Sequence, residues 1–210
     1  MDDRNQTTIE TWDKLAAAYE EKFMDLDLYN DTYDTFCQLI EKQAAHILEI
    51  GCGPGNITKY LLAQRPDFNI DATDAAPNMV KAAQENNPTA YCTLMDCHDI
   101  DTLTTKYDAV MCGFCMPYLS KDDCRKLIKD SAYVLNSGGI LYFSTIEDEY
   151  NKSGYETSSN GEHTIFVYYH EAGYLKDYLQ ENNFELLTIE RKDYPQAAHP
   201  THIIFIARKK

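Results

Sequence analysis

Three glycines alternate in the stretch LEIGCGPGNIT, residues 48–58, directly after a run of apolar residues. Glycine is the residue that a chain needs where the backbone takes a positive φ or where a ligand must touch the backbone. A turn of this kind, between a buried strand and a helix, is a typical ligand site in open α/β sheets. Gly51, Gly53 and Gly55 therefore predict a binding turn, against the alternative of a tight turn that holds no ligand.

A dinucleotide site is the second interpretation of this turn. It requires the spacing G-x-G-x-x-G, whereas the spacing here is G-x-G-x-G, with Asn56 where the third glycine belongs. Pro54 also removes one backbone N–H from the loop. No Gly-Lys-Ser/Thr sequence follows, which excludes a P-loop. The turn is thus a poor cradle for a pyrophosphate, and an NAD(P)-dependent oxidoreductase stays as the alternative.

An acidic residue at the end of the next strand-like run adds a second part of a nucleoside site. Asp74 follows Gly51 at a separation close to the roughly 20 residues found between glycine and acid in dinucleotide folds. A carboxylate at a strand end can accept hydrogen bonds from both hydroxyls of a ribose. The pair predicts that a nucleoside lies across the ends of two neighbouring strands.

Alternating apolar runs predict the elements that position these residues. Two amphipathic helices are expected in the first 44 residues, and one helix followed by two strands after residue 170. The short loop between these last two strands makes them antiparallel. A further strand is expected at 163–169. The remaining expected strands alternate with helices and lie at 45–50, 68–73, 90–95, 107–112 and 140–145. This alternation predicts an α/β fold with a mostly parallel sheet and helices on both faces.

Local signals predict where individual helices begin and end. Pro77 suits the first turn of one helix, and Ser120 with Asp123 resembles the capping box of another. The second of these helices is expected to run through Leu135 and to end at Gly138 and Gly139.

Composition limits the classes of partner. The chain has 210 residues, a net charge of -15 and a sequence pI of about 4.7, so it repels nucleic acid and anionic membranes. No apolar run is long enough for a transmembrane helix, and the polar, acidic start is unlike a secretory signal. Seven cysteines without an export signal are expected to be reduced thiols in the cytoplasm. Cys112 and Cys115 form a CxxC, but no second pair or suitably spaced histidine completes a metal site, so no metal is predicted.

Five segments resemble the consecutive motifs of the class I S-adenosylmethionine-dependent methyltransferases. LEIGCGPGNIT resembles the first, an acidic residue followed by G-x-G-x-G. The others follow in the family's order and are IDATDAAPNMV, LMDCHDI, YDAVMCGFCMPYLS and VLNSGGILYFST. The resemblance spans about residues 10–145. It implies a doubly wound, mostly parallel sheet of seven strands in the order 3-2-1-4-5-7-6, with strand 7 antiparallel and a short insertion after strand 5.

The resemblance also implies one domain over 1–210 that consists of four consecutive parts. Residues 1–44 would be N-terminal lid helices, 45–145 the cofactor-binding core, 146–170 the insertion, and 171–210 the C-terminal helix and antiparallel strand pair. The activity implied is methyl transfer from S-adenosylmethionine to an oxygen or nitrogen of a small molecule by in-line displacement. A protein that binds this cofactor without turnover is a further alternative.

By the same resemblance, the three glycines would pack against the methionine part of the cofactor and Glu49 would organise that end of the site. Asp74 would bind the ribose, Ala75 and Met79 the adenine ring, and Asp96 the adenine amino group. Cys97 and Cys112 would act through their backbones. Tyr19 would close over the cofactor, with a core aromatic as the alternative. The expected cofactor-binding residues are Tyr19, Glu49, Gly51, Gly53, Gly55, Asp74, Ala75, Met79, Asp96, Cys97 and Cys112.

The sequence does not identify a single catalytic residue. An oxygen or nitrogen acceptor can require removal of a proton, and histidine titrates near neutral pH. The candidates are His163 and His170 in the insertion and Tyr118, which the resemblance places near the methyl group. His98 is a lesser candidate. The histidines expected to be structural or exposed are His46, His199 and His202.

Tyrosine is abundant, with 16 residues, many of them in the expected lid helices and the C-terminal part. A tyrosine-lined cavity would suit a small organic acceptor of aromatic or cationic character. Aromatic packing between lid and sheet is the alternative. The expected assembly is a monomer or a homodimer.

Overall fold

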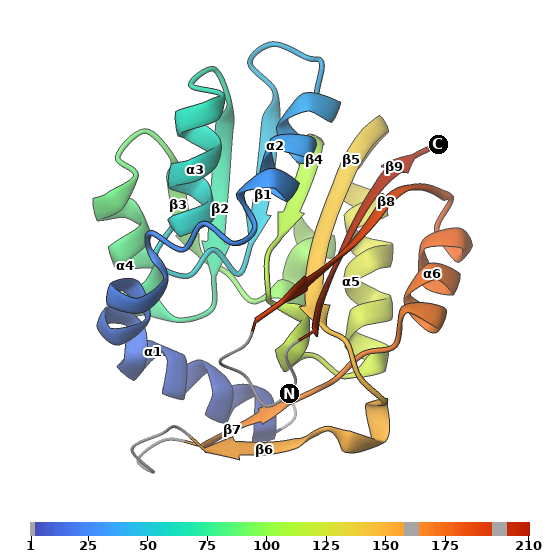
Figure 1. Cartoon of the computed structure of the whole chain (residues 1–210). Coiled ribbons are helices and arrows are strands. Elements are labelled where there is room, and N and C mark those ends of the chain that lie inside the picture. The colour runs from blue at the N-terminus through green and yellow to red at the C-terminus, as the bar shows by residue number, and fades with distance from the viewer. Residues whose placement is uncertain (1–2, 158–163, 195–200) are drawn as a thin grey trace.

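A seven-stranded sheet forms the centre of the computed structural model, which describes residues 3–157, 164–194 and 201–210 (Figure 1). The strand order is β3-β2-β1-β4-β5-β9-β8. Strands β1 to β5 are parallel, and β9 runs antiparallel between β5 and β8. The strands are β1 (His46–Ile50), β2 (Asn69–Asp74), β3 (Tyr91–Leu94), β4 (Tyr107–Cys112), β5 (Leu135–Ile146), β8 (Phe184–Asp193) and β9 (Thr201–Lys209). Because β8 and β9 are the sixth and seventh strands of this sheet along the chain, the order 3-2-1-4-5-7-6 predicted from the sequence is confirmed.

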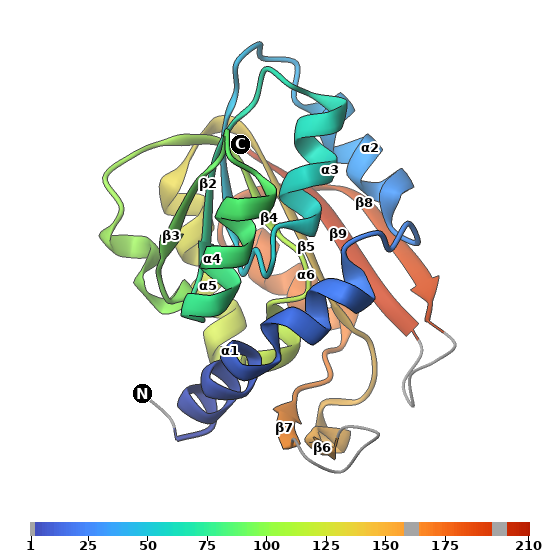
Figure 2. The ribbon, with the colours of Figure 1, turned by 90° about the vertical axis from the view of Figure 1, so that its left-hand side faces the viewer.

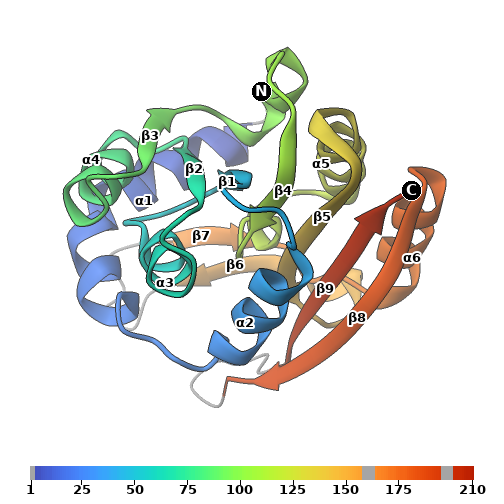
Figure 3. The same cartoon turned by 90° about the horizontal axis from the view of Figure 1, so that it is seen from above.

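Helices cover both faces of this sheet (Figures 1 and 3). Phe36, Leu61 and Ala83, one each from α2, α3 and α4, belong to the apolar cluster on one face. Leu127 and Leu179 place α5 and α6 on the other. The helices are α1 (Asp3–Phe23), α2 (Asn30–Leu39), α3 (Asn56–Gln64), α4 (Pro77–Asn86), α5 (Lys121–Val134) and α6 (Ala172–Glu181), with short 3-10 turns η1 (Cys97–Thr102), η2 (Met116–Tyr118) and η3 (Tyr150–Lys152). The two layers make the sheet core inaccessible and leave its carboxyl edge for a ligand.

Helix α1 and a two-stranded hairpin lie across that carboxyl edge (Figures 1 and 2). The hairpin pairs β6 (Gly154–Thr157) with β7 (Thr164–Val167). The Arg4 guanidinium lies 4.4 Å from the ring centre of Phe166 and joins α1 to β7. The Asp13 carboxylate of α1 accepts a 2.7 Å hydrogen bond from the backbone N–H of Asn78 in α4. The strand expected at 163–169 is thus confirmed as β7, which pairs with β6 in a separate hairpin beside the site.

The end of α5 differs from the sequence prediction. The helix ends at Val134, and β5 begins at Leu135 in extended backbone. Leu135 is buried, and the Lys209 ammonium group donates to two carbonyl oxygens at the end of the helix, at 2.6 and 2.7 Å. Gly138 and Gly139 therefore lie within β5, where Gly138 has φ +78. The prediction that the helix runs through Leu135 to these glycines was wrong, because a lysine from the last strand satisfies the helix end.

The glycine turn has the predicted backbone. Gly51, Gly53 and Gly55 all have positive φ, of 66, 55 and 84. Gly55 is also held by packing, because a Cβ there would lie 2.2 Å from Asn87 Nδ2. That buried amide donates to the carbonyl oxygens of Gly55 and Ala83, at 3.0 and 3.1 Å. The turn is therefore tied from behind to the end of α4.

Replacing Gly55 with alanine is expected to lower the free energy of unfolding by about 2 kcal/mol, from left-handed strain and displacement of the Asn87 amide. Urea denaturation measures this loss. Gly138→Ala is the matched control, since it also has a positive φ but a Cβ there meets nothing within 4 Å. It should lose about 1 kcal/mol, the strain alone. Equal losses in the two variants would contradict the packing role of Gly55.

Candidate active site

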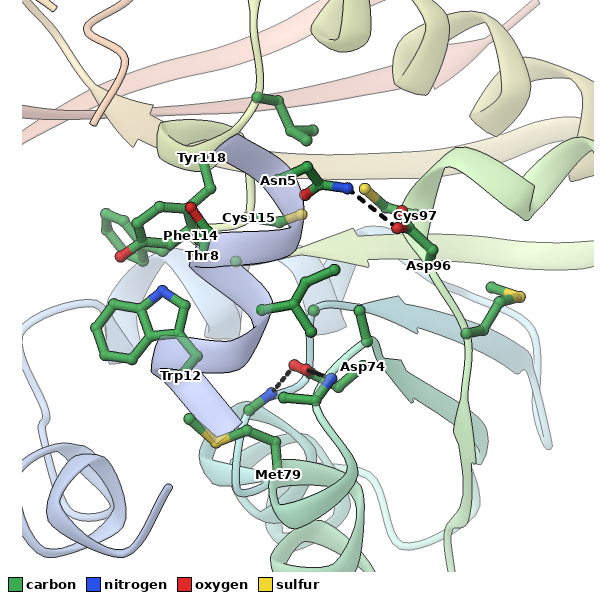
Figure 4. Close-up of a pocket in the computed structure, with 18 of the residues that line it drawn as sticks. Asn5, Thr8, Trp12, Asp74, Met79, Asp96, Cys97, Phe114, Cys115 and Tyr118 are labelled. Carbon is green, nitrogen blue, oxygen red and sulfur yellow. Dashed lines mark hydrogen bonds between the residues drawn. The ribbon is translucent and has the colours of Figure 1, made fainter. Parts of the chain in front are cut away.

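A cavity lies at the carboxyl edge of the sheet, under α1 (Figure 4); its empty space, including the part open to solvent, is about 740 Å³. Its wall combines the glycine turn with the ends of β2, β3 and β4. The residues that line it are Asn5, Thr8, Ile9, Trp12, Tyr19, Gly51, Gly53, Asp74, Ala75, Ala76, Met79, Met95, Asp96, Cys97, Gly113, Phe114, Cys115, Tyr118 and Leu119. The structure thus brings eight of the eleven predicted cofactor residues to one cavity: Tyr19, Gly51, Gly53, Asp74, Ala75, Met79, Asp96 and Cys97.

Asp74 ends β2 and faces this cavity (Figure 4). Its Oδ2 accepts a 2.9 Å hydrogen bond from the backbone N–H of Gly53, and its Oδ1 accepts one of 2.9 Å from Ala76. Burial raises the pKa of Asp74 above its usual value, and these two N–H groups counteract the shift. One carboxylate therefore fixes the glycine turn to the start of α4 and presents its remaining lone pairs to the cavity.

Asp96 forms the far end of the same wall. It lies between Asn5 of α1, whose amide is 3.2 Å from Oδ2, and His98, whose Nδ1 is 2.6 Å from Oδ1. Hydrogen bonding to His98 lowers the pKa of Asp96 to about 2 and raises that of His98 to about 11. The ion pair thus favours the protonated imidazolium form of His98. His98 lines neither cavity and holds the Asp96 carboxylate, which makes it a poor candidate for a base.

Glu49 lies behind the glycine turn and lines neither of the cavities described here. Its Oε2 accepts a 2.6 Å hydrogen bond from Thr58 in the first turn of α3, while its buried Oε1 has no partner among the described residues. Burial raises the pKa of Glu49 to about 8. Glu49 thus joins β1 to the helix that the turn begins, which agrees with an organising role.

Two further predicted residues lie outside the cavity wall. Gly55 packs against Asn87 and Ala83. Cys112 is fully buried in the core, and Gly113, the next residue, lines the cavity instead. A Cβ at Gly113 would lie 2.2 Å from Ile57 Cδ1, so this strand end passes close to α3.

Sequence reasoning missed the parts of the wall contributed by α1 and by the segment after β4. Thr8 and Trp12 lie one helical turn apart and point into the cavity with Asn5 (Figure 4). That spacing is the signal that the sequence offers, but it equally fits a helix face that packs on the core. Phe114 has φ +58, rare for a bulky residue, and its N–H bonds Ser144 Oγ at 2.9 Å. Such strain is common at functional sites.

A second cavity adjoins the first; its empty space, including the part open to solvent, is about 1170 Å³. Seven residues line both and so form the boundary between them: Trp12, Tyr19, Gly51, Gly53, Gly113, Phe114 and Tyr118. The rest of its wall is mostly apolar or aromatic and comes from α1, α2, the β6–β7 hairpin and the ends of β5, β8 and β9. These remaining residues are Phe23, Leu26, Tyr29, Tyr33, Cys52, Asn56, Ile57, Pro117, Ile146, Glu156, Ile165, Val167, Tyr194 and His202.

The structure describes two of the three candidate catalytic residues, and these two lie in different surroundings. His163 lies outside the described residues. His170 is fully buried away from both cavities, where it contacts Tyr174 Oη at 2.6 Å and the Met116 carbonyl oxygen at 3.0 Å, and burial lowers its pKa to about 4. Tyr118 lines both cavities, and burial raises its pKa, so it is a neutral phenol. Of the three candidates, Tyr118 alone is placed by the structure at the boundary.

His202 is the histidine that the structure adds to the site. It was expected to be structural or exposed, yet it is 7% exposed and lines the second cavity. No local signal identified it, because β9 is an apolar strand whose end reaches the cavity only through the antiparallel pairing with β5 and β8.

All seven cysteines are free thiols. Asp96, Cys97 and His98 bring one ligand atom each within 4.8 Å of one another, but Asp96 and His98 already form an ion pair. The absence of a metal stays a prediction. Within the described part of the chain, no helix has the length and apolar character needed to cross a membrane.

The donor set of the first cavity fits a nucleoside without phosphates. Two carboxylates, Asp74 and Asp96, lie on its wall, and none of the described lining residues is lysine or arginine. A pyrophosphate would meet negative charge there instead of a cation. The indole N–H of Trp12, on the same wall, is buried without a protein partner among the described residues. The chain has a Rossmann-like fold, and the lining of its first cavity suits a cationic or neutral nucleoside.

Comparison with known proteins identifies a methyltransferase domain in the middle of the chain. Residues 47–139 match the sequence profile of the methyltransferase domain. The N-methyltransferase NodS from Bradyrhizobium japonicum WM9, solved with S-adenosylhomocysteine, aligns with a TM-score of 0.74 at 16% identity over 97% of this chain and 98% of that one. A Burkholderia thailandensis 1,6-didemethyltoxoflavin-N1-methyltransferase aligns with a TM-score of 0.73 at 15% identity over 98% and 88%. Residues 47–139 therefore carry the sequence features of a methyltransferase domain, and the chain has the fold of these solved methyltransferases.

Curated relatives match over shorter stretches. A trans-aconitate 2-methyltransferase from Mycobacterium ulcerans (strain Agy99) is 43% identical over 53 residues, which are 25% of this chain and 20% of the relative. A malonyl-acyl carrier protein O-methyltransferase from Acetivibrio thermocellus is 33% identical over 109 residues, or 51% and 38%. The chain thus spans only a fifth to two fifths of the length of these two relatives.

Proposed function

We propose that the chain binds S-adenosylmethionine in the first cavity and transfers its methyl group to a small molecule in the second. The observation that carries the proposal is the pair of adjoining cavities, one with two carboxylates and no lysine or arginine among its described lining residues, the other mostly apolar and aromatic. The cofactor would supply a methyl group bound to a sulfonium, with S-adenosylhomocysteine as the leaving group when the acceptor attacks the methyl carbon. The residues of the chain supply orientation and exclusion of water.

Each part of the first wall has a role in this proposal. Asp74 accepts hydrogen bonds from the ribose hydroxyls, and the Gly51–Gly53 backbone packs against the methionine end. Ala75 and Met79 bind the adenine ring, and Asp96 its amino group. Glu49 and Asp74 keep the turn in place through Thr58 and Gly53.

Tyr118 and Tyr19 separate the two cavities in this proposal. Burial raises the pKa of Tyr19 to about 12 and that of Tyr118 further, so both are neutral hydrogen-bond donors near neutral pH. Tyr118 packs edge to face on Trp12 at 5.5 Å between ring centres. These rings exclude water from the boundary where the methyl group passes.

The acceptor is a small molecule in this proposal, since a net charge of -15 opposes binding of nucleic acid. The substrates named for the curated relatives are not carried over, because the matches cover little of those proteins. A monomer or homodimer in the cytoplasm stays the expectation.

The test uses the single tryptophan of the chain, Trp12, which lines both cavities. Its fluorescence should change on titration with S-adenosylhomocysteine and not with NADH, and Trp12→Phe should remove the signal. Tighter binding of NADH would replace the proposal by the oxidoreductase alternative. A metabolite screen for release of S-adenosylhomocysteine from S-adenosylmethionine then separates an enzyme from a protein that binds the cofactor without turnover.

A further inference from the structure

The second cavity has almost no charge. Glu156, at the exposed rim, is the one aspartate, glutamate, lysine or arginine among the described lining residues. The segments outside the described residues are MD, SSNGEH and PQAAHP, which contain no lysine or arginine either. A carboxylate buried without a cation loses its hydration with no compensating partner. The cavity therefore disfavours anionic acceptors.

His202 supplies the polar group of this cavity that is held most firmly. Its ring is stacked on Tyr194 at 5.5 Å and on Tyr29 at 5.9 Å between ring centres, with interplanar angles of 16° and 19°. Phe114 packs against it at 4.9 Å. Its Nδ1 lies 2.5 Å from Tyr29 Oη. Rings on several sides and one short hydrogen bond leave the imidazole little freedom to turn.

The Tyr29 contact decides which nitrogen carries the proton. Burial lowers the pKa of His202 to about 4 and raises that of Tyr29, so both groups are neutral near neutral pH. A phenol O–H is more acidic than a neutral imidazole N–H, so Tyr29 donates and Nδ1 accepts. The ring proton then sits on Nε2, for which no hydrogen bond to a described residue is found. Since His202 lines the cavity, a proton on Nε2 would make this nitrogen the donor available to a ligand there.

We infer that the second cavity binds flat, uncharged ring compounds, that it rejects carboxylates, and that the Nε2–H of His202 orients the acceptor by donating to its carbonyl oxygen or ring nitrogen. Tyr29 acts as a positioning residue by selecting the tautomer of His202. The inference rests on the proposed function and names the class of acceptor for that same site.

A matched pair of probes tests the charge preference. 4-Hydroxybenzamide and 4-hydroxybenzoate have the same ring and nearly the same shape. The first carries a neutral amide where the second carries a carboxylate. On protein saturated with S-adenosylhomocysteine, calorimetric titration should show the amide binding at least about tenfold more tightly. Equal or tighter binding of the carboxylate, or no binding of either probe, would overturn the inference.

Variants test the role of His202. His202→Phe keeps an aromatic ring but removes the donor, and should weaken the amide roughly tenfold while leaving S-adenosylhomocysteine affinity unchanged. His46→Gln, at the opposite end of the sheet, is the control and should change neither. Nitrogen-15 NMR of the imidazole should show the proton on Nε2, and Tyr29→Phe should lose that preference. A proton on Nδ1 in the parent protein would contradict the assignment.

The outcomes also separate the two proposals. Absence of S-adenosylhomocysteine binding means that the proposed function fails. Normal S-adenosylhomocysteine binding together with a preference for the carboxylate means that the acceptor class alone is wrong.

Discussion

Replacing Asp74 with alanine is expected to weaken binding of S-adenosylhomocysteine by about 3 kcal/mol, roughly a hundredfold. Two losses add in this variant. The ribose hydroxyls lose a charged hydrogen-bond acceptor, and the backbone N–H groups of Gly53 and Ala76 lose the carboxylate that holds the turn against α4. Calorimetric titration of the folded variant measures the change.

The control for Asp74→Ala is Asp99→Ala, which removes the same charge from an exposed position in η1. It should leave the affinity unchanged. Asp74→Asn keeps the shape of the side chain and should fall between the two. An Asp74→Ala variant that binds S-adenosylhomocysteine as the parent does would show that the first cavity is not the cofactor site.

Raising the pH from about 5 to 8 is expected to lower the stability of the ligand-free protein through Glu49. The folded protein keeps a proton on this buried carboxyl up to about pH 8, whereas the usual pKa is 4.5. Between these values the folded state binds more protons than the unfolded chain, so the free energy of unfolding falls as the pH rises. At 1.36 kcal/mol per pKa unit, the loss is about 3–5 kcal/mol.

Urea denaturation across this pH range measures the Glu49 contribution as the difference between parent and Glu49→Gln. The glutamine cannot ionise, so its curve should fall less steeply, and the two should diverge as the pH approaches 8. Glu185→Gln, on an exposed position of β8, should follow the parent. Parallel curves for the parent and Glu49→Gln would mean that Glu49 is ionised in the folded protein over the whole range.

Much of the first cavity could be predicted from the sequence. The glycine turn follows β1, Asp74 ends β2 and Asp96 lies two residues after β3. Parallel neighbouring strands end at the same edge of the sheet. Short segments with clear strand and turn patterns therefore bring these residues together without knowledge of distant contacts. The fold order followed from the same local alternation.

The end of α5 shows where local patterns stop being sufficient. Two glycines after a helix normally signal its end, but here Lys209, at the end of the last strand, bonds the carbonyl groups near Leu135. That contact exists only after β9 has paired with β5.

The sequence by itself determined the class of fold, the glycine turn and the carboxylates of the first cavity, because each is encoded in a short continuous segment. The tertiary structure alone decided the second cavity, since its wall is assembled from α1, α2, the β6–β7 hairpin and the ends of β8 and β9. His202 and Tyr29 are 173 positions apart, and neither carries a local pattern that points to the other. Long-range packing, with burial that shifts the pKa values of both groups, turns two ordinary residues into one oriented hydrogen-bond donor.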